Sequence, residues 1–260
     1  MPDTAFRKLS YATKLISAET RYFEQVSEWE AKRQTLLVQL ADIPTLVREH
    51  LERRSQPYGL DPKISIVDQV PTIRLANACE ATANCLYSVA EISANFANKA
   101  TKGLVPSSFN ALRKKCENGS LTDISSALGD LQWFRKIREL RTEWTHYSSI
   151  FIASGDNKEV LLCVRSYRRS SDKIEFTTPN FSCTIDEFLG WVRSALSTLD
   201  RFAEYLFNHH VLPSFSLDTT FTSAVHDKNG FPIIKEDMRF EVETITVAEY
   251  LRRGGISVGG

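Results

Sequence analysis

The chain has 260 residues, of which 42% are hydrophobic and 25% are charged, and this composition is too apolar for an intrinsically disordered protein. Its 32 basic residues balance 32 acidic ones, and a net charge of zero counts against a protein that binds extended duplexes regardless of sequence. The length allows one large domain, or a core domain with additions at either end.

The cysteines are odd in number and widely spaced, and none forms a C-x-x-C pair (Cys79, Cys85, Cys116, Cys163 and Cys183). This pattern predicts reduced thiols rather than a disulfide framework or a zinc site. The N-terminus lacks the apolar stretch of a secretory signal, and no apolar run approaches membrane length. We therefore expect a soluble, cytoplasmic protein that does not interact with a membrane.

In the N-terminal part of the chain, helical periodicity predicts two amphipathic helices. Apolar residues recur at steps of three and four through about residues 4–40. Asp42-Ile43-Pro44 interrupts that pattern and is suited to begin a second helix, over residues 45–54, because proline is tolerated in a first turn. Residues 55–62 are the clearest linker candidate.

Residues 71–100 are predicted to form a second long helix with an apolar stripe and a polar stripe on roughly opposite sides. The apolar stripe is Leu75, Cys79, Thr82, Leu86, Val89 and Phe96, and the polar one is Asn77, Glu80, Asn84, Tyr87 and Glu91. A short helix is expected near residues 107–116, because Asn118-Gly119 is a strong stop signal.

A third major helix is expected over about residues 122–152, because its core-facing seam is unusually regular. Large apolar residues recur there at alternating steps of four and three: Trp133, Ile137, Leu140, Trp144, Tyr147 and Phe151. Two β-prone runs follow, residues 159–167 and 174–181, and the polar residues 168–173 between them indicate a β-hairpin.

The last long helix is predicted to begin at a capping box, Thr184-Ile185-Asp186-Glu187. Its expected buried stripe is Ile185, Phe188, Leu189, Val192, Leu196, Leu199, Phe202, Leu206 and Phe207. After Pro213 the pattern favours short strands around a turn at residues 226–230, and the chain closes in a glycine-rich tail.

The sequence therefore predicts a mainly α fold. The expected organisation is N-terminal amphipathic helices in residues 1–55, a helical bundle in residues 68–212 and a C-terminal extension in residues 213–260. The bundle would carry a small β-hairpin inserted before its last long helix, and the extension would be short strands or irregular chain.

Arg141 and His146 lie in the third major helix, separated by four residues in the run KIRELRTEWTHY. An R-x-x-x-x-H pair in that helix, just before a hairpin and a closing helix, resembles the signature of the HEPN superfamily over about residues 70–211. The resemblance implies a HEPN-like helical bundle and a metal-independent endoribonuclease with Arg141 and His146 as catalytic residues. Imidazole can exchange protons with the 2′-hydroxyl and the leaving group, and guanidinium can neutralise the phosphate.

Helix geometry separates these two side chains. Five residues at about 100° each place Arg141 and His146 about 140° apart around a straight helix. Either the helix ends or distorts near His146, or the same residues of a second subunit complete the site. The resemblance favours the second arrangement, because HEPN RNases generally place their Arg-His pairs in a cleft between two protomers, and it therefore implies a homodimer.

Other residues are candidates for supporting roles, each with a structural alternative. Thr142, Glu143, Asn84 and Glu80 would support the catalytic pair, and Asn84 and Glu80 would otherwise belong to a solvated helix face. Arg138, Arg165, Arg168 and Arg169 would bind RNA phosphates. The alternatives for these arginines are ion pairs within the helix, which Glu139 and Glu143 can supply, and a solvated hairpin loop.

The expected function is thus RNA cleavage, as a toxin or defence component with an antitoxin or defence partner. The alternative is a catalytically inactive HEPN-like module that binds a partner protein, RNA or nucleotide. Thr142 stands where many HEPN RNases have Asn, Asp or His, and Ser148 stands where one toxin subgroup has a modifiable tyrosine. No motif of nucleotide hydrolysis, zinc proteolysis or serine esterase chemistry occurs.

Overall fold

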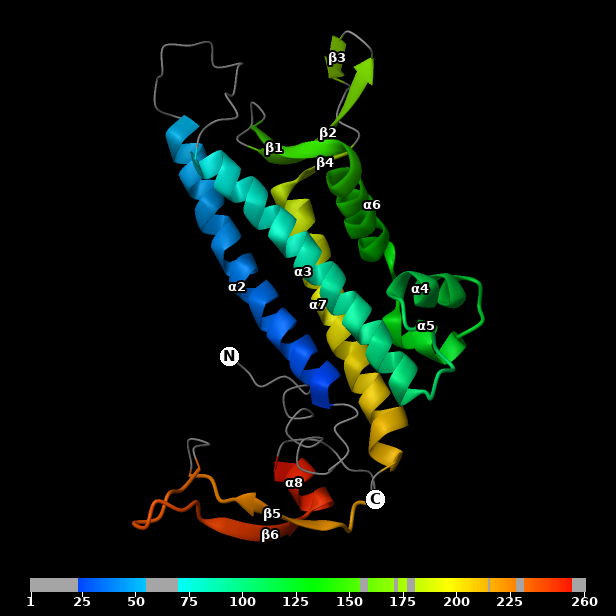
Figure 1. Cartoon of the computed structure of the whole chain (residues 1–260), viewed down its shortest axis with the longest axis vertical. Coiled ribbons are helices and arrows are strands. Elements are labelled where there is room, and N and C mark those ends of the chain that lie inside the picture. The colour runs from blue at the N-terminus through cyan, green and yellow to red at the C-terminus, as the bar shows by residue number, and fades with distance from the viewer. Residues whose placement is uncertain are drawn as a thin grey trace. The chain divides into compact units, whose positions relative to one another are not determined.

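The computed structural model describes residues 23–54, 70–154, 159–170, 173–176, 181–214, 216–227 and 232–253. Its helices are α2 (Phe23–Arg54), α3 (Val70–Ala100), α4 (Phe109–Glu117), α5 (Thr122–Leu128), α6 (Gln132–Tyr147), α7 (Ile185–Leu206) and α8 (Val247–Arg253). Its strands are β1 (Ser148–Ser154), β2 (Val160–Ser170), β3 (Lys173–Phe176), β4 (Phe181–Thr184), β5 (Thr220–Ala224) and β6 (Val242–Thr246). The predicted mainly α fold with small β elements is confirmed (Figure 1).

The chain is organised in two compact units. The first comprises residues 1–30, 92–127 and 200–260, and the second residues 31–91 and 128–199. The division falls inside α2, α3, α5 and α7, so each of these helices contributes residues to both units. The three segments expected from the sequence stay a prediction.

The expected interruption at Asp42-Ile43-Pro44 is wrong, because α2 continues through Pro44. A proline inside a helix removes one backbone hydrogen bond and costs about 3 kcal/mol. Burial offsets this cost, since Leu36 and Ile43 are both 0% exposed and Leu46 is 6% exposed, while Pro44 itself lies at the surface. Residues 1–22 and the linker candidate at residues 55–62 lie outside the described residues.

In the second unit, polar contacts join α2 to α3. The Nδ1 atom of His50 lies 3.0 Å from the Thr72 hydroxyl oxygen, and Cys85 Sγ donates to the Lys32 carbonyl at 3.2 Å. The predicted apolar stripe of α3 is confirmed, since its residues are between 0% and 2% exposed. Asn77, Glu80 and Asn84 of the polar stripe are exposed, as expected.

The single helix expected over residues 122–152 is wrong, because the chain forms α5, α6 and β1 there. Gly129 has a φ of +61°, which ordinary residues rarely adopt, and it separates α5 from α6. The Asp130 carboxylate then accepts a hydrogen bond from the Gln132 backbone N–H at 2.9 Å and begins α6. Trp133, Ile137 and Leu140 of the predicted seam are buried, at 4%, 0% and 0% exposure.

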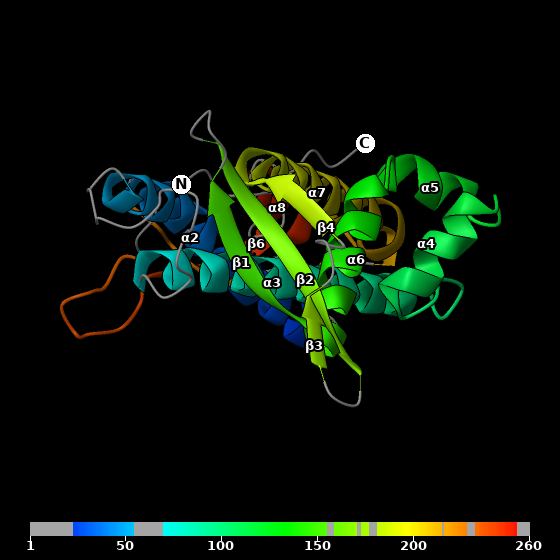
Figure 2. The ribbon, with the colours of Figure 1, turned by 90° about the horizontal axis from the view of Figure 1, so that it is seen from above.

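After Tyr147 the chain leaves the helix because it pairs with another strand. β1 runs antiparallel to β2 from Ser148↔Ser166 to Ser154↔Val160. β4 pairs with the same part of β2 from Leu161↔Thr184 to Val164↔Phe181, so β2 lies between β1 and β4 (Figure 2). This sheet directly follows α6 and precedes α7, and it therefore fixes where α6 ends.

The predicted hairpin is confirmed as β2 and β3, with different bounds. β2 continues to Ser170, so Arg168 and Arg169 belong to a strand and not to the expected loop. They pair with Glu175 and Ile174 of β3. Phe181, expected to end the second hairpin strand, belongs to β4 instead.

The capping box that begins α7 is confirmed. The Thr184 hydroxyl accepts a hydrogen bond from the Glu187 backbone N–H at 3.0 Å, and the Glu187 carboxylate accepts one from the Thr184 N–H at 2.8 Å. Every residue of the predicted buried stripe is 7% exposed or less. A π-helical turn, Phe207–Val211, and a short 3-10 turn, Leu212–Ser214, continue the chain.

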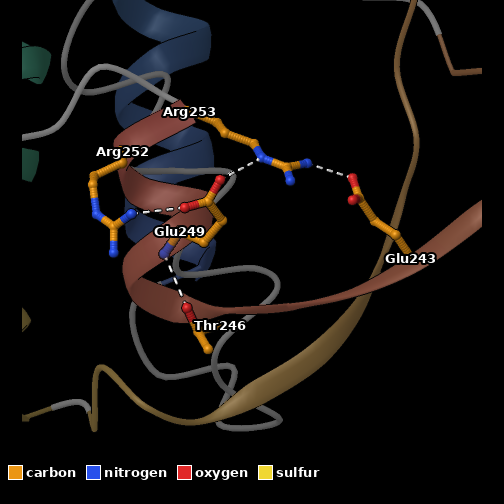
Figure 3. A network of polar contacts seen from close by, with 5 residues as sticks. All are labelled: Glu243, Thr246, Glu249, Arg252 and Arg253. Atoms are coloured by element: carbon orange, nitrogen blue, oxygen red, sulfur yellow. Dashed lines mark hydrogen bonds and ion pairs between the residues drawn. The ribbon is translucent and has the colours of Figure 1, made fainter.

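The short strands expected after Pro213 are present as β5 and β6, although β6 extends beyond the predicted end at Glu243. The structure shows that the two strands pair antiparallel and that an unpredicted helix, α8, follows them. Thr246 begins α8, because its hydroxyl accepts a hydrogen bond from the Glu249 N–H at 3.1 Å (Figure 3). Arg253 of α8 binds the carboxylates of Glu249 and of Glu243 in β6. Part of the predicted turn, residues 228–230, and the tail at residues 254–260 lie outside the described residues.

The five cysteines are free, and all of them are buried. Burial is the main cause that raises the pKa of the Cys79 and Cys183 thiols to about 12 each, from an ordinary value of 9.0. These thiols therefore stay protonated in the folded chain at neutral pH.

Candidate functional site

The structure brings together Arg141 of α6 and Asn84 of α3, two residues that the sequence placed in the candidate site. Arg141 Nε donates a hydrogen bond to Asn84 Oδ1 at 3.3 Å, across 57 residues of sequence. Asn84 is exposed and Arg141 is partly exposed, so the contact lies at the protein surface. A polar residue from the earlier helix thus orients the arginine of the R-x-x-x-x-H pair.

Tyr87, one turn after Asn84 on α3, holds the same arginine through its ring. Arg141 Cζ lies 4.3 Å from the centroid of the Tyr87 ring, which is the geometry of a cation–π contact. The Tyr87 ring also stacks on Phe134 of α6, with centroids 5.6 Å apart and planes at 21°. Asn84 therefore binds the Nε edge of the guanidinium, and the Tyr87 ring contacts its face.

Phe134 connects this surface contact to the core of the second unit. It is 0% exposed, and the Trp133 ring meets it edge-on at 5.6 Å and 86°. Edge-on and offset-stacked aromatic pairs are favourable, and they restrict the rings they join. Arg141 is thus positioned by a series of ring contacts that begins at the buried side chains of Trp133 and Phe134.

The Tyr87 hydroxyl is kept in its neutral form. Burial raises the pKa of Tyr87, and the charge and hydrogen bond of Glu91 raise it further, against the opposing charges of Arg141 and Arg138. The phenol therefore remains uncharged at neutral pH and can donate its proton to Glu91.

The other candidate residues of α3 and α6 whose side chains the structure describes are exposed, and they differ in the contacts they make. Glu80 is exposed, one turn before Asn84, and Arg138 is exposed, one turn before Arg141. Thr142 is also exposed, and its hydroxyl donates to the Arg138 carbonyl at 2.8 Å, a bond within its own helix. Glu139, expected to pair with an arginine of this helix, makes an ion pair of 3.8 Å with Lys136.

His146 and Glu143 lie in the last turns of α6, which ends at Tyr147, one residue beyond His146. Their side chains are outside the described residues, as are those of Arg165, Arg168 and Arg169 in β2. The catalytic role of His146 and the RNA-binding role of the three β2 arginines therefore stay predictions.

The sequence placed Tyr87 in the polar stripe of α3 but did not identify it as a site residue. Its signal was the spacing of three residues from Asn84, which puts both on one face of a helix. No sequence pattern indicated Phe134, the ring that stacks on Tyr87, because Phe134 lies between the predicted seam positions Trp133 and Ile137.

Among the residues that the structure describes, no group of three or more His, Cys, Asp or Glu side chains is arranged to hold a metal ion. The described helices include none with the length and apolar character that crossing a membrane requires. No protein-family model, curated protein or solved structure matches this chain.

Proposed function

We propose that this protein is a metal-independent endoribonuclease of the HEPN type. The contact that supports this proposal is the Arg141 Nε–Asn84 Oδ1 hydrogen bond, together with the Tyr87 ring beneath the guanidinium. An arginine held from two directions is preorganised, and a preorganised donor stabilises developing phosphate charge more effectively than a mobile one.

In the proposed reaction the 2′-hydroxyl of the RNA attacks the adjacent phosphorus, and the bond from phosphorus to the 5′ oxygen breaks. His146 accepts the hydroxyl proton or supplies a proton to the leaving 5′ oxygen. Arg141 offers paired donors to the phosphate as its charge builds up. The products are a 2′,3′-cyclic phosphate and a 5′-hydroxyl, and the proposed reaction uses no metal or other cofactor.

The proposal includes a homodimer, which the HEPN resemblance implies, because Arg141 and His146 lie about 140° apart around the helix that carries both. His146 of one protomer would act with Arg141 of the other. Arg138, exposed one turn from Arg141, and the β2 arginines Arg165, Arg168 and Arg169 would bind neighbouring phosphates. The setting proposed is a cytoplasmic toxin or defence component, controlled by an antitoxin or defence partner.

The test is cleavage of single-stranded RNA by the purified chain in EDTA. His146→Ala should abolish cleavage while the circular dichroism spectrum and thermal midpoint stay those of the wild type. His226→Ala, which removes an exposed histidine outside α6, is the matched control and should retain full activity. Undiminished cleavage by His146→Ala would overturn the assignment.

A second candidate is an RNA-binding module that does not cleave. The Thr142 hydroxyl favours it, because it is bonded to the Arg138 carbonyl within α6, at the position where many HEPN RNases carry Asn, Asp or His. Fluorescence anisotropy with a labelled RNA separates the two candidates. Binding that requires Arg141, without any cleavage by the wild type, would favour the binding module.

A further inference from the structure

The end of α7 gathers three aromatic side chains. Tyr205 lies in the last turn of α7, and His209 and His210 lie in the π-helical turn that follows. The centroid of the Tyr205 ring is 4.6 Å from that of His209 and 5.9 Å from that of His210. Tyr205 and His210 are partly exposed and His209 is exposed, so solvent reaches all three. We call these three residues the aromatic cluster.

The π-helical turn accounts for this grouping. In a regular α-helix His209 would lie about 40° round from Tyr205, but His210 would lie about 140° away. The turn is wider by one residue, because the Leu212 backbone N–H donates to the Phe207 carbonyl. Both histidines can therefore contact one tyrosine ring. Single π-helical turns are rare and are found frequently at functional sites.

α5 lies close to the aromatic cluster. Burial raises the pKa of Tyr205, and the negative charge of Asp123 in α5 raises it further. The phenol therefore stays neutral at neutral pH. Only residues 118–121 separate α5 from α4, so α4 is the next element along the chain from the cluster.

The end of α3 and the helix α4 carry an excess of positive charge. Residues 99–117 contain five basic residues and one acidic residue, in a chain whose net charge is zero. The acidic residue, Glu117, pairs with the buried Arg113. The four lysines are at least partly exposed and make no ion pair with another residue that the structure describes. We call them the lysine group: Lys99, Lys102, Lys114 and Lys115.

A folded connection keeps the two parts of the lysine group near each other. The Thr101 hydroxyl donates to the Ala97 carbonyl at 2.8 Å and accepts a hydrogen bond from the Val105 N–H at 3.2 Å. The Ser108 hydroxyl then begins α4 by accepting a hydrogen bond from the Ala111 N–H at 3.4 Å. The lysine group and the aromatic cluster both belong to the first unit, whereas Arg141 belongs to the second.

We propose that the aromatic cluster and the lysine group bind single-stranded RNA. Unpaired bases stack on aromatic rings, and lysines bind the phosphates between the bases. The Asp123 carboxylate repels phosphates, so we expect bases, and not the backbone, over the Tyr205 ring. An acidic peptide would use the lysines and leave the rings without a partner, and a duplex hides the faces of its bases. This binding rests on RNA as the substrate of the proposed function, but it does not depend on cleavage.

The test is fluorescence anisotropy of the full-length chain with a labelled 2′-O-methyl oligoadenylate of about 12 nucleotides. This probe has no free 2′-hydroxyl and resists the proposed reaction. Tyr205→Leu should weaken binding about tenfold without changing its salt dependence, because it removes a stacking ring and no charge. Tyr205→Phe keeps the ring and should bind as the wild type does. A Tyr205→Leu variant with wild-type affinity, or an equal loss in both variants, would overturn the proposal.

The lysines should be visible in the salt dependence. Lys114→Gln and Lys115→Gln should each lower the slope of log Kd against log salt by about 0.7, the contribution of one phosphate contact on a single strand. Lys235→Gln is the matched control, since Lys235 is exposed, lies between β5 and β6, and should keep the wild-type slope. The same slope in all three variants contradicts a phosphate-binding role for the lysine group. Circular dichroism and the thermal midpoint check that each variant is folded.

A labelled oligoglutamate of the same net charge separates RNA from an acidic protein as the occupant. It should bind at least tenfold more weakly than the oligoadenylate, and equal binding would overturn the proposal. The outcome is independent of the cleavage test. Unchanged binding by Tyr205→Leu removes this inference alone, whereas undiminished cleavage by His146→Ala removes the proposed function and leaves the binding result in place.

Discussion

Two arginines of this protein are held in contrasting ways. Arg253 of α8 binds two carboxylates, those of Glu243 and Glu249, and these raise the pKa of its guanidinium. Arg141 of α6 is oriented by an amide oxygen and by the face of a tyrosine ring. The first set of contacts places carboxylates against the arginine, whereas Asn84 and Tyr87 are uncharged groups that fix the direction of the guanidinium.

This difference separates a structural arginine from a candidate functional one. Glu243 and Glu249 secure the end of α8 to β6, and the network is local to the C-terminal strands and helix. Asn84 and Tyr87 are uncharged partners on another helix, and their contacts suit an arginine that must meet a phosphate. The expected consequences of substitution differ accordingly.

The largest effect is expected at Phe134, the ring that links Tyr87 to the core. Phe134→Ala should lower the free energy of unfolding by about 3–5 kcal/mol, because it leaves a cavity at a fully buried position. Denaturant titration measures this loss. Phe134→Leu keeps most of the volume and should cost under about 1.5 kcal/mol, so an equal loss in both variants would contradict a packing role.

Arg141→Lys should reduce RNA cleavage about 100-fold at unchanged thermal stability, because an ammonium cannot reproduce the bidentate geometry of guanidinium. Arg253→Lys is the matched substitution in the contrasting region and should leave the cleavage rate unaltered. Initial rates in EDTA compare the two. Equal losses of cleavage would remove the distinction between the two arginines.

Tyr87→Leu should reduce cleavage about tenfold, since it removes the aromatic face that supports Arg141. Tyr87→Phe keeps the ring and loses only the hydroxyl, so its rate should stay within about twofold of the wild type. The expected loss is in the rate of cleavage at saturating RNA. A loss of the same size in both variants would assign the effect to the hydroxyl and to Glu91 instead.

The smallest effect is expected at Glu243. Glu243→Gln should lower the thermal midpoint slightly at low ionic strength, and high salt should erase the difference, because exposed ion pairs are screened. RNA cleavage should not change. A large loss of stability that persists in high salt would show that the Arg253 network does more than fasten α8.

The fold was predictable where a local pattern and the tertiary structure agree. The stripe of Leu75, Cys79, Leu86 and Val89 and the Thr184–Glu187 capping box are signals contained in single segments. The prediction failed at Pro44, where burial on either side outweighs the proline, and at residues 122–152. Over residues 122–152 the regular spacing of apolar residues predicted one continuous helix, whereas the chain breaks at Gly129 and leaves the helix where β1 pairs with β2.

The candidate site was predictable only in its residue types. Resemblance and stripe patterns pointed to Arg141 and Asn84, but a contact across 57 residues depends on how α3 and α6 pack. The Tyr87–Phe134 stack depends on the same packing, and a polar stripe gives no indication of which ring lies beneath an arginine. The strand position of Arg168 and Arg169 was missed because a run of charged residues favours a loop by composition alone.

The rates of RNA cleavage in EDTA by Arg141→Gln and Arg253→Gln test most directly whether Arg141 is held for chemistry and Arg253 for structure. Each variant removes one positive charge, from the partly exposed Arg141 or from the exposed Arg253. We expect a loss of about 100-fold for Arg141→Gln and none for Arg253→Gln, with 2′,3′-cyclic phosphate ends in the wild-type products. Cleavage undiminished by Arg141→Gln, or equally reduced in both variants, would contradict this expectation.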